Sequence, residues 1–284
     1  MIPFPLPPLV STGWLAARLA EPGLVILDTS WYLPSTGRNA AEEFVGGHLP
    51  GAVFFDLDVG SDQASPLPHM LPSESAFARY AGSLGIGNDD AVVVYDGSGG
   101  NMSAARVWWM FRAFGHSNVT VLDGGLGKWR EEGRPLEAGE VRATPRRFRA
   151  RLAGERVRTL SQVSRALLSG EAQVVDTRPA GRFQGTAPEP RPGLPSGHMP
   201  GAVNVPYTEL VHADGTALSS EELRARLAAA GVRTDLPVIA TCGSGTSACT
   251  LLHALFQLGQ DDGGLYDGSW TEWAGSGMPV VEGA

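Results

Sequence analysis

Short apolar runs recur along the chain, separated by longer stretches in which apolar residues return with a helical period. The runs lie at 25–28, 52–56, 91–96 and 118–123 in the first half, and at 174–178, 202–206, 237–242 and 264–268 in the second. Runs this short with few polar positions are typical of strands buried on both faces. They therefore predict the buried strands of a parallel sheet.

Amphipathic stretches fill the spaces between these runs. The clearest lie at 73–85, 103–115, 220–231 and 247–259, and each ends on a glycine. Glycine just past the last periodic residue is a frequent helix stop. Alternation of buried strands with amphipathic helices indicates parallel α/β layers.

The same motifs occur twice in the same order. GLVILDTS (23–30) returns as AQVVDTRP (172–179), GHLPGAVFFDL (47–57) as GHMPGAVNVPY (197–207), VVVYDGSGG (92–100) as VIATCGSGT (238–246), and LDGGLGKW (122–129) as LYDGSWTEW (265–273). A repeat as long as a domain indicates duplication of a whole domain, because solenoid repeats are far shorter. We predict two tandem α/β domains, each a mostly parallel sheet flanked by helices.

The domain limits follow from composition. The segment 131–157 is rich in charge and weak in periodicity, so we predict that it is the linker. We place the first domain at 1–145 and the second at 158–284.

Both cysteines lie within TCGSGTSACT, residues 241–250. Cys242 ends an apolar run, and Gly243 and Gly245 after it allow a tight loop that turns backbone N–H groups toward one anion. The helix predicted next adds its positive N-terminal end. We therefore predict that Cys242 is a thiolate nucleophile. We expect further hydrogen bonds from the loop hydroxyls of Ser244, Thr246 and Ser247.

Two further residues bear on this loop: Cys249, its second cysteine, and Asp96, at the matching position of the first half. Cys249 falls inside the helical pattern beside leucines, so we interpret it as a packing residue. Asp96 stands in the first half where Cys242 stands in the second. We therefore expect chemistry in the second domain only.

The two halves, the H-x-P-G-A blocks at His48 and His198, the loop CGSGTSA and the block YDGSW-x-E-W together resemble the two-domain sulfurtransferases of the rhodanese family. The resemblance covers nearly the whole chain and implies two rhodanese-like domains, the first lacking the catalytic cysteine. It implies an enzyme of EC class 2.8.1 that carries sulfur as a persulfide on Cys242. In the family, Cys-Gly-Ser-Gly is typical of the mercaptopyruvate class, whereas thiosulfate enzymes carry basic side chains after the cysteine.

The resemblance also implies roles for residues outside the loop. GRFQGTAPEPRPG (181–193) is similar to the segment whose two arginines hold the substrate carboxylate and carbonyl, which implies that role for Arg182 and Arg191. Asp58 and His69 match residues that join Ser244 in a proton relay. The family loop usually continues Val-Thr-Ala, whereas this chain has Thr246-Ser247-Ala248.

Composition excludes several other classes. Asp and Glu number 30 against 22 Lys and Arg, a net charge of −8, which disfavours nucleic acid as a partner. No apolar run approaches the length of a membrane helix, the start does not resemble a signal peptide, and two cysteines make no disulfide framework. We expect a cytoplasmic enzyme without metal or organic cofactor. Its expected partners are a small sulfur donor, 3-mercaptopyruvate or thiosulfate, and a thiol acceptor such as thioredoxin, with cyanide as an alternative acceptor.

Three alternatives stay open at this point. A thiosulfate:cyanide sulfurtransferase would use the same cysteine with another donor, and a non-catalytic sulfur carrier would hold the sulfur without turnover. A cysteine phosphatase would need an arginine at the end of the loop, where this chain has Ala248.

Overall fold

The computed structural model describes residue 2 and residues 5–283, and these form two compact units. The first unit comprises the described residues up to Gln63 together with Leu71–Ala153 and Ala213–Ala217. The second comprises Ala64–Met70, Gly154–His212 and the described residues from Leu218 onward. Each unit thus includes a short segment from the other half of the sequence, and His69 belongs to the same unit as Cys242.

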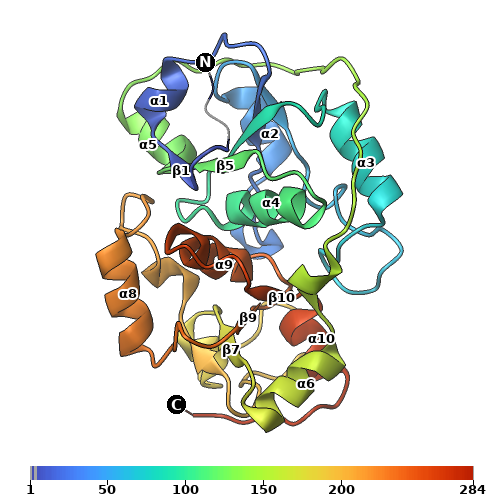
Figure 1. Cartoon of the computed structure of the whole chain (residues 1–284), viewed down its shortest axis with the longest axis vertical. Helices are drawn as coiled ribbons and strands as arrows, with labels where there is room; N and C mark the ends of the chain where they lie inside the picture. The colour runs from blue at the N-terminus through green and yellow to red at the C-terminus, as the bar shows by residue number, and fades with distance from the viewer. Residues whose placement is uncertain (1, 3–4, 284) are drawn as a thin grey trace. The chain divides into compact units, whose positions relative to one another are not determined.

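The first unit is built on a five-stranded parallel sheet with the strand order β1-β5-β4-β2-β3. Its strands are β1 (Leu9–Val10), β2 (Leu24–Asp28), β3 (Ala52–Phe54), β4 (Ala91–Tyr95) and β5 (Val119–Leu122). Its helices are α1 (Thr12–Ala16), η1 (Pro34–Thr36), α2 (Ala40–Gly46), α3 (Glu74–Ser83), α4 (Met102–Ala113) and α5 (Gly125–Glu131). All of β4 is buried, because helices cover both faces of the sheet (Figure 1).

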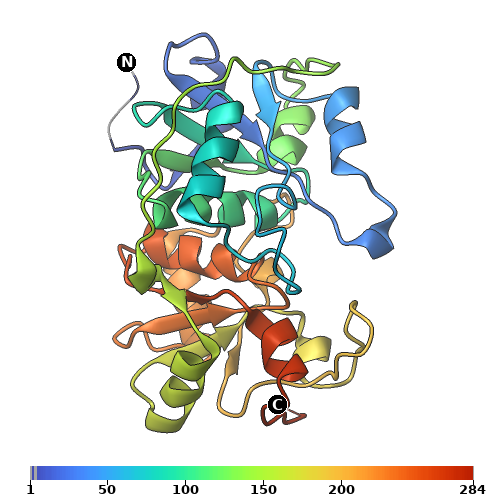
Figure 2. The ribbon, with the colours of Figure 1, turned by 90° about the vertical axis from the view of Figure 1, so that its right-hand side faces the viewer.

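The second unit repeats this plan with the strand order β6-β10-β9-β7-β8. Its strands are β6 (Val157–Arg158), β7 (Gln173–Asp176), β8 (Val203–Asn204), β9 (Val238–Thr241) and β10 (Gly264–Tyr266). Its helices are η2 (Gly154–Arg156), α6 (Leu160–Ser169), α7 (Ala180–Phe183), η3 (Tyr207–Glu209), α8 (Ser220–Ala229), α9 (Ala248–Gln257) and α10 (Ser269–Gly275). Helix α9 packs on β9 and β10, while α6 and α10 share a core with the opposite face (Figure 2).

The two strand orders confirm the duplication predicted from the sequence. Each strand of the first sheet has its counterpart five strands later, in the same position and direction. All the apolar runs predicted as strands form strands, and the amphipathic stretches form α3, α4, α8 and α9. The glycines that end these helices all have φ between 79° and 87°, the left-handed region that favours glycine.

The two H-x-P-G-A histidines make the same contacts in each unit. His48 stacks on Phe44 at 3.9 Å between ring centroids, and its Nδ1 is 2.7 Å from the Phe44 carbonyl oxygen. His198 stacks on Phe183 at 3.8 Å, and its Nδ1 is 2.9 Å from the Phe183 carbonyl oxygen. Both histidines are buried, and each links its H-x-P-G-A block to the helix that precedes it, α2 or α7.

The stretch between α5 and η2 forms neither helix nor strand, and it belongs to the first unit. The Arg146 N–H donates to the Gly82 carbonyl at 2.8 Å, and the Arg151 N–H donates to the Phe114 carbonyl at 3.0 Å. Among the described residues, no helix is both long enough and apolar enough to cross a membrane.

Candidate active site

Cys242 follows the last residue of β9 and begins a six-residue loop that leads into α9. Cys242 is 2% exposed. Gly245 has φ 77°, which a non-glycine residue rarely adopts, so this turn depends on glycine. The loop therefore takes the strand-loop-helix form predicted from the sequence.

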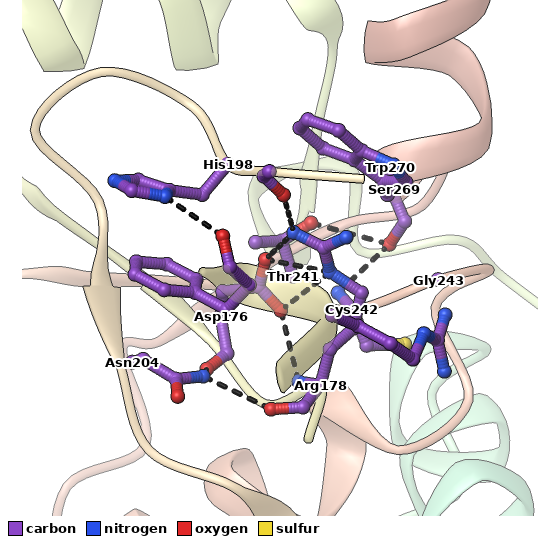
Figure 3. Close-up of polar contacts among 12 residues, drawn as sticks. Asp176, Arg178, His198, Asn204, Thr241, Cys242, Gly243, Ser269 and Trp270 are labelled. Atoms are coloured by element: carbon purple, nitrogen blue, oxygen red, sulfur yellow. Dashed lines mark hydrogen bonds and ion pairs between the residues drawn. The ribbon is translucent and has the colours of Figure 1, made fainter. Parts of the chain in front are cut away.

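Helix α10 fixes the first two residues of this loop (Figure 3). The Cys242 N–H donates to Ser269 Oγ at 3.2 Å, and the Cys242 carbonyl accepts from the Trp270 N–H at 2.9 Å. The Gly243 carbonyl accepts from the N–H of Thr271 at 3.1 Å and from its Oγ1 at 2.7 Å. Ser269 holds this position with φ 51°, and its hydroxyl donates to the Tyr266 carbonyl.

Three backbone N–H groups of the loop take no part in these anchoring contacts. No acceptor among the described residues takes a hydrogen bond from the backbone N–H of Gly243, Ser244 or Thr246. Converging N–H groups before a helix N-terminus form a concavity that stabilises an anion. The loop can therefore stabilise a thiolate, or the charged outer sulfur of a persulfide.

Both predicted arginines reach this loop. A Cβ atom built on Gly243 would lie 3.1 Å from Nη2 of Arg182 and 3.5 Å from Nη1 of Arg191. Arg182 extends from α7, and Arg191 from the segment that follows. The two guanidinium groups thus converge beside the residue after the cysteine, where they can hold a small carboxylate.

A buried carboxylate orients Arg182. Glu189 has a side chain 2% exposed and accepts from Arg182 Nε at 3.0 Å and from Arg182 Nη2. It also accepts from Arg178 Nη1 at 2.7 Å. Glu189 therefore joins the two guanidinium groups, and the sequence analysis missed it because an acidic residue in a Gly/Pro-rich segment gives no sign of burial.

Arg178 is the buried centre of this charge network (Figure 3). It is paired with Asp176 through Nε and Nη2, and its guanidinium lies 4.2 Å from the Trp270 ring centroid. Burial acts to lower the pKa of Arg178, but the Asp176 and Glu189 carboxylates outweigh it, so the pKa is raised. Arg178 is therefore a permanent cation that holds Glu189, and through it Arg182.

His69 lies beside the cysteine loop. Its Nδ1 is 2.9 Å from Ser244 Oγ and 3.1 Å from Thr246 Oγ1. His69 is 5% exposed and has φ 58°, an uncommon conformation for a histidine. The structure thus brings together His69 and Ser244, the two relay residues that belong to the second unit.

Asp58 belongs to the first unit. Its two carboxylate oxygens each lie 3.2 Å from Trp31 Nε1, which donates to them. The Asp58 N–H donates to the Asp56 carboxylate at 2.9 Å. The contribution of Asp58 to the relay stays a prediction.

The remaining loop side chains support the backbone. Ser247 Oγ is 3.1 Å from Thr177 Oγ1, so its hydroxyl links the loop to the segment after β7. The Cys249 thiol is fully buried and donates to the Gly245 carbonyl at 3.3 Å. Cys249 thus packs behind the loop.

Asp96 lies in the matching loop of the first unit, and its carboxylate accepts hydrogen bonds from donors of that loop and of the helix after it. Its carboxylate accepts from the N–H and hydroxyl of Ser98 at 2.8 Å and 2.6 Å, from Ser103 Oγ at 3.1 Å and from the Ala104 N–H at 2.9 Å. The loop of the first unit therefore already contains its own anion.

Known proteins resemble this chain over most of its length. The family model described as Rhodanese-like domain matches residues 11–132 and 159–276. Human 3-mercaptopyruvate sulfurtransferase is 47% identical over 270 residues, which cover 93% of this chain and 91% of the human protein. Thiosulfate sulfurtransferase from Bos taurus is 49% identical over 271 residues, with the same shares covered. The crystal structure of the 3-mercaptopyruvate sulfotransferase SseA from Escherichia coli has a TM-score of 0.86 and 41% identity, covering 93% of this chain and 99% of that one.

Proposed function

Because the chain belongs to the rhodanese family of sulfurtransferases, we propose that it moves sulfane sulfur from 3-mercaptopyruvate to a thiol or cyanide acceptor through a persulfide on Cys242. The observation that carries this proposal is the convergence of Arg182 and Arg191 on Gly243, next to Cys242. In the described residues, the N–H groups of Gly243, Ser244 and Thr246 in the same loop have no acceptor. The two arginines can bind a carboxylate, and the loop N–H groups can stabilise negative charge on sulfur.

Substrate binding uses the two arginines. The planar guanidinium fork suits a carboxylate, because two parallel N–H bonds fix both its position and its plane. In 3-mercaptopyruvate the carboxylate is separated from the sulfur by the carbonyl and methylene carbons. Arg182 and Arg191 therefore hold the far end of the donor while its sulfur faces Cys242.

Sulfur transfer then follows as one nucleophilic displacement. The Cys242 thiolate attacks the donor sulfur, the carbon–sulfur bond breaks, and its electron pair stays on carbon as the enolate of pyruvate. The enolate takes up one proton from the Ser244–His69 pair, and the persulfide releases the thiol proton that the donor sulfur carried. The N–H groups of Gly243, Ser244 and Thr246 stabilise the outer persulfide sulfur.

The second half-reaction regenerates the thiolate. A thiolate or cyanide attacks the outer sulfur, and the sulfur–sulfur bond breaks with its electron pair on Cys242. A dithiol such as thioredoxin suits this step, because its second thiol can release the sulfur from the mixed persulfide. The covalent intermediate implies ping-pong kinetics.

Thiosulfate is the second candidate donor, since one relative that is 49% identical carries the name thiosulfate sulfurtransferase. The residues after Cys242 favour mercaptopyruvate. Gly243 and Ser244 are neutral, and the adjacent positive charge comes from Arg182 and Arg191, of which Arg182 is already paired with Glu189. A dianion bound directly at the sulfur would find less positive charge than a carboxylate bound further out.

Side-by-side kcat/KM values for the two donors, with cyanide as a common acceptor, test the assignment. We expect mercaptopyruvate to be the better donor, with one pyruvate formed for each thiocyanate. Cys242→Ser should abolish both products, since a hydroxyl cannot form the persulfide. A higher kcat/KM for thiosulfate would reassign the donor, and pyruvate release by Cys242→Ser at the wild-type rate would refute the mechanism.

A further inference from the structure

One nitrogen of His69 faces two hydroxyl groups. Nδ1 lies 2.9 Å from Ser244 Oγ and 3.1 Å from Thr246 Oγ1. All three residues are buried, at 5%, 6% and 3% exposure, so bulk water does not compete for these contacts. A proton relay between Ser244 and His69 needs only the first of these contacts, so the Thr246 contact is additional.

The chemistry of imidazole limits how two hydroxyls can share one ring nitrogen. A bare Nδ1 has a single in-plane lone pair, which is directed well toward one donor only. A protonated Nδ1 can share its hydrogen between two oxygen acceptors in a three-centre bond. Two hydroxyls at nearly equal distance therefore favour a proton on Nδ1.

We propose that Thr246 is a positioning residue for proton delivery to the departing pyruvate carbanion: its hydroxyl holds the proton on His69 Nδ1 and then occupies that nitrogen once the proton has moved. This inference rests on the proposed function, because it concerns the donor half-reaction of the same site. It gives a role to the position where this chain has Thr246 and the family loop usually has valine.

Each proton that moves in this step has a donor and an acceptor at the site. Ser244 passes its hydroxyl proton to the enolate, and the His69 imidazolium passes its Nδ1 proton to Ser244 Oγ. The ring is left neutral with its proton on the other nitrogen, and the Thr246 hydroxyl rotates to donate to the bare Nδ1. The thiol proton released from the donor sulfur restores the imidazolium.

The threonine hydroxyl suits this exchange because it is both donor and acceptor. A valine has the same shape but can do neither, so Nδ1 would lose one partner in a site closed to water. Ser244 would remain as a hydroxyl contact, but the state in which the proton has moved would lose one of the two hydrogen-bonding groups that stabilise Nδ1, and its energy would rise. Removal of the hydroxyl should therefore slow the step that consumes a proton and spare steps that do not.

The test compares two half-reactions in the full-length Thr246→Val enzyme. Single-turnover pyruvate release from mercaptopyruvate should fall roughly tenfold, as expected when general acid catalysis is impaired. Removal of sulfur from the preformed persulfide by cyanide needs no proton from His69, so its rate should stay at the wild-type value. Thr246→Ser keeps the hydroxyl and should restore pyruvate release.

Thr250→Val is the matched control. Thr250 lies in the first turn of α9, four residues after Thr246. Its buried hydroxyl has no partner among the described residues, so the same change should leave both half-reactions unaffected. In ¹⁵N NMR of imidazole-labelled protein, with His69→Gln to assign the signal, Thr246→Val should shift His69 Nδ1 toward the unprotonated form.

Equal slowing of both half-reactions, no rescue by serine, or an unchanged Nδ1 signal would each overturn the role of Thr246. Failure of the wild-type enzyme to release pyruvate at all would instead refute the proposed function. The NMR comparison would still report whether Thr246 governs the Nδ1 proton.

Discussion

At the scale of single residues, charge at the site is arranged in pairs. Asp176 and Glu189 together balance Arg178 and Arg182, and Glu189 touches both guanidinium groups. The Glu189 side chain is nearly inaccessible to solvent, so burying its charge without the two arginines would be costly. Glu189 thus fixes the direction of Arg182 without contacting Gly243 itself.

Glu189→Gln should weaken both binding and folding. The amide keeps the shape but removes the charge, which leaves Arg182 less firmly oriented toward the substrate carboxylate. We expect the KM for mercaptopyruvate to rise by roughly ten- to a hundredfold, and the free energy of unfolding to fall by about 3 kcal/mol. Steady-state kinetics and urea denaturation measure the two effects.

Asp261→Asn provides the control, because it removes one charge from an ion pair with Arg156 in which the Asp261 side chain is 43% exposed. Its expected cost is at most about 1 kcal/mol, with KM unchanged. A KM for Glu189→Gln equal to that of the wild type would show that Arg182 needs no such support.

At the scale of elements, the site consists of one loop held by neighbouring helices. Helix α10 donates hydrogen bonds to the carbonyls of Cys242 and Gly243. Helix α7 places Arg182 so close to Gly243 that a Cβ atom added there would contact its guanidinium group. Gly243 does not have a positive φ, so glycine is needed here for space. The absence of a side chain is what lets both arginines approach the loop.

Gly243→Ala should therefore impair substrate binding with little loss of stability. The added methyl would lie 3.1 Å from Arg182 Nη2, which can move because it ends a flexible side chain. We expect kcat/KM for mercaptopyruvate to fall roughly tenfold, mainly through KM. Gly127→Ala is the control, since nothing lies within 4 Å of its added methyl and it sits inside α5.

The control should stabilise the protein by at most about 1 kcal/mol and leave the kinetics unchanged. If Gly243→Ala kept the wild-type KM, the added methyl would not disturb the two arginines. Substrate binding would then not require the absence of a side chain at this position.

The elements that the sequence predicted lie in stretches with a visible pattern, an apolar run for a strand and an amphipathic period for a helix. Strands such as β4 and helices such as α4 were predicted for this reason, whereas the short strands β1 and β6 lie outside any such apolar run and could not be. The short helix α10 was noticed only as a repeated block, and its hold on Cys242 depends on Ser269 in a left-handed conformation. Such contacts arise from the tertiary fold and leave no periodic pattern.

At the scale of the whole molecule, one fold occurs twice and its two loops differ in what they stabilise. In the first unit, the Asp96 carboxylate accepts the hydrogen bonds of its own loop. In the second, the backbone N–H groups of Gly243, Ser244 and Thr246 have no acceptor within the described part of the chain. The repeat and the Asp96 replacement were visible in the sequence, and the distribution of hydrogen bonds explains why chemistry is expected in one unit.

Intact-protein and peptide mass spectrometry after treatment with mercaptopyruvate, without acceptor, tests the central claim most directly. We expect one added sulfur atom per chain, located on the peptide with Cys242, removed by cyanide and absent in Cys242→Ser. Pyruvate release without added sulfur, or sulfur found on Cys249 in place of Cys242, would contradict it.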